Sequence, residues 1–230
     1  MSMKETFKSS LLEAGLRLDC TEGYGRLVLQ ARFPVVLASA SPRRRDLLSS
    51  LFRKFEIVEP SLFEENYVST DPWATGSNSA RAKADLVASS KSDSLVIAGD
   101  TVVAFESGEA WRQLGKPEDS ASAVGMLGAL SGKRHAVISA VAIRSPDASF
   151  DFVDTSWVTF RELSPDEIAE YASSGEPMDK AGAYAIQGGA SRFVQTVEGE
   201  LSTVIGLPIE RLERELINSG LAVIYEPEAT

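Results

Sequence analysis

Apolar and polar residues follow two different periods along the chain, and the pattern predicts strands and helices in alternation. Short apolar runs at residues 35–37, 95–105, 135–143 and 152–160 are typical of buried strands. Apolar residues recur every three or four positions at 41–52, 121–130 and 208–219, as expected for helices with one buried face. This mixed order of strands and helices predicts an α/β fold.

Capping sequences mark the starts of two of the expected helices. Ser41 is followed by a proline, a combination that favours a helix start. The segment 164–167 (Ser-Pro-Asp-Glu) has the spacing of a capping box, and Gly175 is suited to end that helix. Residues 1–32 show only a short leucine-bearing stretch before two glycines. We therefore expect an N-terminal extension at 1–32 and a single domain at 33–226.

Composition narrows the class of protein. The 230 residues are 43% hydrophobic, enough for a core that needs no disulfide or metal. Cys20 is the one cysteine, the N-terminus lacks a secretory signal, and no apolar run approaches the about 18 residues of a membrane span. These features predict a cytoplasmic protein with no membrane partner. The net charge of −10 argues against a nucleic-acid polymer as partner, since that would need a broad basic surface.

Several kinds of active site lack their residues in this sequence. His135 is the one histidine, so cysteine–histidine catalysis and zinc sites are not expected, and His135 itself is interpreted as structural. No Walker loop or dinucleotide-binding glycine motif occurs either.

Positive charge is densest where a buried strand meets the first turn of a helix, at residues 38–45 (Ala-Ser-Ala-Ser-Pro-Arg-Arg-Arg). Arginines at a helix start oppose the helix dipole unless an anion binds there. Backbone amides, the hydroxyls of Ser39 and Ser41, and the guanidinium groups of Arg43 and Arg44 would suit a polyphosphate. A solvated basic turn remains the alternative.

A carboxylate interrupts the most apolar predicted strand at Asp100, between Gly99 and Thr101. Burying an unpaired charge is costly, so Asp100 must reach a cleft, a hydrogen-bond partner or a cation. Beside a phosphate site it could hold a divalent ion or activate water. The alternative is that Asp100 merely caps a turn. The hypothesis requires the arginine turn and Asp100 to face one another across one groove.

Three polar residues are weaker candidates for the same site. Lys83 falls on a predicted helix, and Lys116 lies in a tight Gly-Lys-Pro loop. Either lysine could instead be a solvated surface residue. Gln187 follows a stretch rich in glycine and alanine, and its amide could read a nucleobase edge or satisfy the loop backbone.

The order of short motifs from about residue 34 to 220 resembles the Maf-type pyrophosphatase family. The motifs are Leu-Ala-Ser at 37–39, Ser-Pro-Arg-Arg at 41–44, Gly-Asp-Thr at 99–101, Gly-Lys-Pro at 115–117, Leu-Ser-Gly at 130–132, Asp-Lys-Ala-Gly-Ala-Tyr at 179–184, Ile-Gln-Gly at 186–188 and Gly-Leu-Pro at 206–208. Ala185 departs from the family's usual glycine, and the stretch 107–114 is longer than typical.

The resemblance implies an elongated, mixed-sheet fold like that of the inosine-triphosphate pyrophosphatases, with a central substrate cleft between two lobes. It implies hydrolysis of a nucleoside triphosphate to the monophosphate and pyrophosphate, dependent on Mg²⁺ or Mn²⁺. Asp100 matches the catalytic position, and Asp100 with Glu65 matches the metal-binding acids. The substrate-binding positions fall on Ser39, Arg43, Arg44, Lys83, Thr101, Lys116 and Gln187.

Within the family, the set Arg43, Thr101 and Gln187 resembles the subgroup that acts on dTTP and UTP, including modified pyrimidine nucleotides. A 7-methyl-GTP or purine-type pyrophosphatase is the alternative enzyme, and a non-catalytic, nucleotide-sensing regulator of septum formation is the alternative of another class. A homodimer is left open.

Overall fold

The computed structural model describes residues 28–225, which form two compact units. The first unit comprises residues 28–101, 138–155 and 200–225, and the second comprises 102–137 and 156–199. Each unit combines strands with helices, so the predicted α/β class is confirmed. In the described part of the chain, no helix is long and apolar enough to cross a membrane.

The sheet of the first unit is built around a short, fully buried strand, β2 (Val35–Ala38). It lies parallel to both β3 (Glu56–Val58) and the beginning of β4 (Leu95–Ser107), with Ala38 level with Ala98. The strand order continues through β6 (Arg134–Arg144) and β7 (Ser149–Phe160). A separate antiparallel pair joins β1 (Leu29–Ala31) to β9 (Ala222–Ile224).

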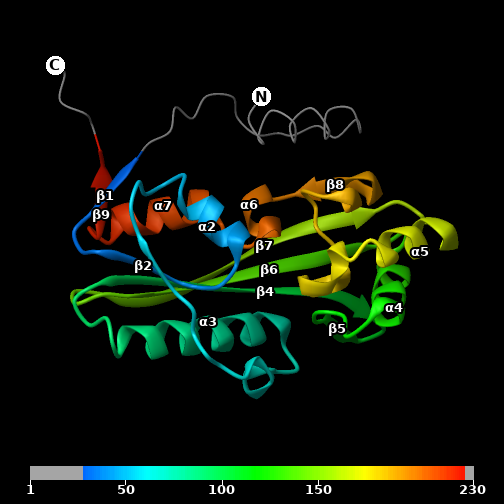
Figure 1. Cartoon of the computed structure of the whole chain (residues 1–230), viewed down its shortest axis with the longest axis horizontal. Coiled ribbons are helices and arrows are strands. Elements are labelled where there is room, and N and C mark those ends of the chain that lie inside the picture. Colours follow the sequence, from blue (N-terminus) through cyan, green and yellow to red (C-terminus); the bar gives the residue numbers. More distant parts are fainter. Residues whose placement is uncertain (1–27, 226–230) are drawn as a thin grey trace. The chain divides into compact units, whose positions relative to one another are not determined.

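Helices cover both faces of this sheet (Figure 1), with α2 (Pro42–Leu48) and α7 (Ile209–Asn218) on one face and α3 (Pro72–Ala88) on the other. Successive side chains of β4 enter opposite cores, because strand residues alternate between faces. Ile97 packs with Leu48 and Leu212, whereas Ala98 packs with Ala84 of α3. The same alternation directs the side chain of Thr101 away from that of Asp100.

The second unit contains the far ends of β4 and β7 and the beginning of β6. β5 (Ala110–Leu114) pairs antiparallel with β4, and β8 (Val194–Glu198) pairs antiparallel with β7. Its α-helices are α4 (Ser120–Leu130) and α5 (Pro165–Ser173). Short 3-10 helices follow at η2 (Glu176–Asp179), η3 (Ala181–Ala183) and η4 (Gly189–Phe193).

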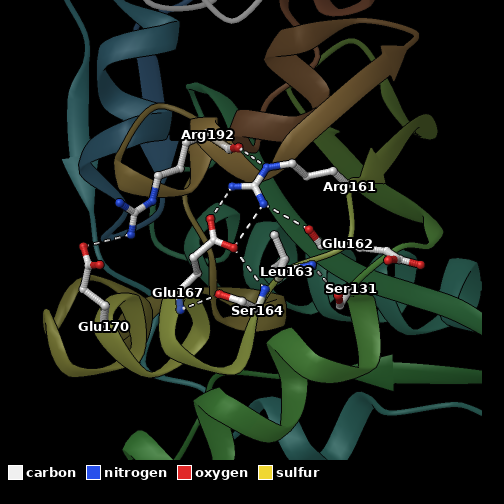
Figure 2. A network of polar contacts seen from close by, with 8 residues as sticks. All are labelled: Ser131, Arg161, Glu162, Leu163, Ser164, Glu167, Glu170 and Arg192. Carbon is white, nitrogen blue, oxygen red and sulfur yellow. Dashed lines mark hydrogen bonds and ion pairs between the residues drawn. The ribbon is translucent and has the colours of Figure 1, made fainter.

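The start of α5 is fixed by the capping box expected from the sequence (Figure 2). The backbone amide of Glu167 donates to Ser164 Oγ at 3.3 Å, and the amide of Ser164 donates to Glu167 Oε2 at 3.0 Å. Arg161 then grips the same carboxylate with two nitrogens, at 2.6 and 3.2 Å. Gly175 is left-handed just after the helix, which agrees with its expected role as a stop.

The long elements predicted from periodicity are all present, at 35–38, 95–107, 134–144, 149–160 and 209–218 among others. Lys83 lies on a helix, as expected. The leucine-bearing stretch of the extension falls in residues 1–27, outside the described residues. The division into one extension and one domain stays a prediction.

Candidate functional site

The arginine turn begins where β2 ends, and serine hydroxyls hold its backbone. Ser41 is the N-cap of α2, accepting a long hydrogen bond of 3.4 Å from the amide of Arg44. The amide of Ser41 donates to the buried Ser39 Oγ at 3.2 Å. The hydroxyls of Ser39 and Ser41 therefore both serve to hold the backbone of this turn.

Arg44 lies across the strand residues on either side of Asp100. Its Nε donates to the carbonyl of Gly206 at 2.9 Å, one terminal nitrogen donates to Ser39 Oγ at 3.3 Å, and the other donates to Thr101 Oγ1 at 3.0 Å. A Cβ on Gly99 would lie 3.2 Å from Arg44 Nε. The arginine turn therefore meets Gly99 and Thr101, the neighbours of Asp100, on one face of β4. The expected groove with the turn and Asp100 facing one another is not what this face shows, because the side chain of Asp100 points to the other face.

Thr101 continues this contact toward the centre of the sheet. Its hydroxyl oxygen lies 3.0 Å from Ser139 Oγ on β6, and Ser139 Oγ donates to the carbonyl of Thr203 at 2.8 Å. Thr203 belongs to α6 (Leu201–Ile205), and its own hydroxyl donates to Asp154. A continuous polar chain therefore runs through the first unit beneath the arginine turn.

Asp100 faces the opposite side of β4 and pairs with Lys83 of α3. Lys83 Nζ lies 2.6 Å from Asp100 Oδ1, and the two side chains are only 8% and 15% exposed. This ion pair explains how a carboxylate can lie in an apolar strand, because a buried charge is tolerated when it is paired. Lys83 thus fixes the direction of the carboxylate at the end of the buried strand segment.

Glu65 lies in the 3-10 helix η1 (Glu64–Tyr67) and is exposed. The residues after it line an open pocket of about 340 Å³ between η1 and α3, formed by Asn66, Tyr67, Val68, Asn78, Arg81, Ala82 and Asp85. Among residues 28–225, no group of three or more histidine, cysteine or acidic side chains is arranged to hold a metal ion. Asp100 and Glu65 stay predicted metal ligands.

Lys116 and Gln187 belong to the second unit, and both are exposed. The loop that carries Gln187 is held on both sides rather than being loose. The amide of Ala185 donates to the hydroxyl of Tyr171 at 3.1 Å, and the amide of Gly189 donates to Glu176 Oε2 at 3.1 Å. Tyr171 in turn donates to Glu176 Oε1 at 3.1 Å.

His135 is fully buried in the second unit, as its structural interpretation predicts. Its Nε2 lies 2.9 Å from the hydroxyl of Tyr184, and its ring meets Phe160 edge to face. Burial lowers the pKa of His135 to about 4. The imidazole is therefore neutral at neutral pH.

Sequence reasoning did not single out Ser139 or Thr203, and it noted Gly206 only as part of the Gly-Leu-Pro motif, with no role for its carbonyl. Ser139 is one of the few polar residues in an apolar strand, and this interruption was the signal that could have drawn attention to it. Nothing local could have found the carbonyls of Thr203 and Gly206, because backbone acceptors leave no trace in a sequence.

Comparison with known proteins gives one consistent family. A family model described as Maf-like protein matches residues 34–219. A protein of Bacillus cereus (strain AH820) named dTTP/UTP pyrophosphatase is 44% identical over 191 residues, covering 83% of this chain and 98% of its own length. A protein of the same name from Bacillus cereus (strain ATCC 10987 / NRS 248) is 45% identical, covering 83% of this chain and 92% of its own.

Among solved structures, the Staphylococcus aureus Ham1 protein gives a TM-score of 0.41 at 17% identity, covering 55% of this chain and 71% of that one. That likeness is too weak to carry an argument. The family match and the identities do carry one, since together they span most of the chain. This chain belongs to the Maf-like protein family.

Proposed function

We propose that this protein is a nucleoside triphosphate pyrophosphatase acting on dTTP and UTP, and on modified pyrimidine nucleotides of the same shape. Water would cleave the bond between the α and β phosphates, giving the monophosphate and pyrophosphate. The names of the relatives, which match nearly their whole length, support this activity. A cytoplasmic location, where such triphosphates are used, is part of the proposal.

The observation that carries the proposal is that Arg44 and the Lys83–Asp100 ion pair lie at three consecutive residues of β4, 99–101. Arg44 contacts Gly99 and Thr101 from one side, and Lys83 holds Asp100 on the other. A fixed carboxylate at the residue between two that meet a cationic turn supports this reaction, since phosphoanhydride hydrolysis requires a positioned base and donors for phosphate oxygens.

In this mechanism, the phosphate oxygens would be held by Ser39, Arg43, Lys83 and Lys116. Asp100 orients a water molecule and accepts its proton as the water oxygen attacks the α phosphorus. The bond from that phosphorus to the bridging oxygen breaks, and pyrophosphate leaves with the electron pair. Gln187 would contribute to the choice of base.

Asp100 and Glu65 are the residues that would hold Mg²⁺ or Mn²⁺. Their oxygen donors suit these ions, and Mg²⁺ commonly uses only one or two carboxylates together with substrate phosphates. Asp100 already shares one oxygen with Lys83, so it fits a site completed by phosphate better than a cage made of protein alone. The bound ion would neutralise charge on the leaving pyrophosphate.

The test is Asp100→Asn, which keeps the shape of the side chain but removes the base. We expect pyrophosphate release from dTTP to fall by about 100-fold or more. The variant also removes the negative charge that pairs with the buried Lys83, so it should lose about 3 kcal/mol of unfolding free energy. Urea unfolding must therefore accompany the rate measurement, at a temperature where the variant is folded.

Arg81→Gln is the matched control, because it removes an ion pair, with Asp151, from the same helix but away from Asp100. Its rate should stay close to that of the natural chain. Near-normal turnover by folded Asp100→Asn would refute the role of Asp100. Absence of turnover by the natural chain on pyrimidine and purine triphosphates, with either metal ion, would refute the enzymatic function.

A further inference from the structure

Arg44 uses at least three of its five N–H groups on the protein itself. Each of its three nitrogens donates to a protein acceptor at 2.9 to 3.3 Å. These acceptors are Ser39 just before α2, Thr101 on β4 and Gly206 just after α6. A phosphate gripped by an arginine fork needs two N–H groups on one edge. The guanidinium of Arg44 instead joins three segments of the first unit.

The hydrogen-bond chain below Arg44 has only one direction. Ser139 gives its single hydroxyl proton to the carbonyl of Thr203, so it can only accept from Thr101. Thr101 therefore donates to Ser139 and accepts from Arg44. The direction of donation is therefore fixed from Arg44 through Thr101 and Ser139 to the carbonyl of Thr203. The hydroxyl proton of Thr101 is used in the bond to Ser139.

Two glycines leave room for this arrangement. A Cβ on Gly99 would come within 3.2 Å of Arg44 Nε, and a Cβ on Gly206 would come within 3.3 Å of Thr101 Oγ1. Gly206 also has a φ of +130°, which a residue with a side chain rarely adopts. The backbone on both sides of the guanidinium is therefore shaped to fit it closely.

Asp100 lies between the two strand residues that Arg44 contacts. Its side chain points to the other face, where Lys83 holds one oxygen at 2.6 Å. The strand is thus fixed from one face by Arg44, and the carboxylate from the other by Lys83. A shift of Thr101 would move the neighbouring Asp100 directly, because the two share a peptide unit.

We propose that Arg44 and Ser139 are positioning residues, which act through Thr101 to align Asp100, and that Arg44 is not a phosphate ligand. This inference rests on the proposed function, since it concerns how Asp100 is aligned for the same reaction. It also reassigns Arg44 and Thr101, which the family resemblance would make substrate-binding residues.

The experiment compares kcat and KM for dTTP among Arg44→Lys, Thr101→Val and Ser139→Ala. Lysine keeps the positive charge but cannot bridge three acceptors, and the other two changes break the chain below it. We expect each variant to lose about 10-fold in kcat, with KM changed by less than about 3-fold, as for a small misplacement of the reacting groups. Thr101→Ser, which keeps the hydroxyl, should restore the rate.

A double variant separates positioning from phosphate binding. Arg44→Lys with Thr101→Val should be no slower than the slower single variant, because both changes break the same chain. Ser50→Ala is the control, since it also removes a hydroxyl that donates to a carbonyl, that of Leu47, at the far end of α2. It should leave both kcat and KM unchanged.

A raised KM with normal kcat in Arg44→Lys would overturn the proposal and make Arg44 a phosphate ligand. Normal kcat in Thr101→Val and Ser139→Ala would overturn it as well. Urea midpoints of the same variants test the hydrogen-bond chain from Arg44 to Thr203 by a measurement that does not depend on enzymatic activity. Non-additive shifts in the double variant support it, and additive shifts overturn it, even if the natural chain hydrolyses no triphosphate and the proposed function fails.

Discussion

Gly182 occupies a position in the second unit where two separate constraints exclude a side chain. Its φ is +69°, in the left-handed region that favours glycine. A Cβ there would also lie 2.9 Å from Cγ1 of Val103 on β4. Its amide donates to the carbonyl of Gly115 at 3.1 Å. This glycine therefore keeps the segment before Gln187 packed closely on the sheet.

We expect Gly182→Ala to lower the free energy of unfolding by about 2–4 kcal/mol, combining the cost of a left-handed alanine with overpacking against Val103. The control is Gly108→Ala, where φ is +66° but a Cβ would meet no atom within 4 Å. The control should lose only about 1 kcal/mol. Urea unfolding measures both. Equal losses would mean that packing on Val103 contributes nothing.

The charged residues of the site were accessible to sequence reasoning, whereas Ser139 and Thr203, which continue the polar chain from Thr101, were not. Asp100 and the arginine turn stand out because charge is unexpected in an apolar strand or at a helix start. Ser139 and Thr203 are joined across 64 positions, and the bond uses a backbone carbonyl. Only the folded sheet brings such partners together, so local pattern cannot predict them.

At the scale of single elements, α5 shows how one ion pair reinforces a helix start (Figure 2). Arg161 Nη2 contacts Glu167 Oε1 at 2.6 Å, while Glu167 Oε2 accepts from the amide of Ser164. Arg161 also donates to the carbonyl of Arg192 at 3.0 Å. The capping box is thereby linked to η4, the 3-10 helix that precedes β8. The hydrogen bonds from Arg161, followed by those of Ser164, lower the pKa of Glu167 to about 2.

This lowered pKa predicts where α5 loses support in acid. The folded pKa lies below the ordinary value of 4.5, so the contribution of Glu167 is complete above pH 4.5 and is lost as pH falls toward 2. Glu167→Gln keeps an acceptor for the capping box but removes the charge. We expect its urea midpoint to fall less than that of the natural chain between pH 4.5 and 2.

Glu170→Gln is the control, because it removes one negative charge from the same helix outside the capping box, at the exposed pair with Arg192. If both variants keep the acid dependence of the natural chain, the ion pair of Glu167 has no part in it.

Elements differ in how well their patterns predicted them, and the difference has a physical origin. The capping box of α5 is local, with donor and acceptor three residues apart, so sequence alone indicated it. β5 (Ala110–Leu114) was missed because its residues are mixed in polarity and partly exposed at the edge of the sheet. The 3-10 helices at 176–193 hold their shape through Tyr171, Glu176 and Tyr184, whose partners lie outside each short segment.

On the scale of the whole molecule, the chain has one histidine, and it is fully buried. The unfolded chain would protonate His135 at its ordinary pKa of 6.5, whereas the folded chain resists protonation until about pH 4. The contribution of His135 to stability is therefore complete above pH 6.5 and declines as pH falls toward 4. A shift of this size corresponds to a loss of about 3 kcal/mol.

Glu200 acts in the opposite sense, because burial raises its pKa and its protonation favours the folded state at low pH.

His135→Gln removes this titration while keeping a polar group that can meet the hydroxyl of Tyr184. We expect the variant to be less stable than the natural chain at pH 7.5 but to lose little further stability between pH 6.5 and 4. Unfolding free energies from urea curves at half-unit pH steps measure the difference. A variant that declines as steeply as the natural chain would show that carboxylates, rather than this imidazole, set the acid dependence of the whole protein. A flat profile would assign the loss between pH 6.5 and 4 to His135, a range that overlaps with that of Glu167 only between pH 4.5 and 4.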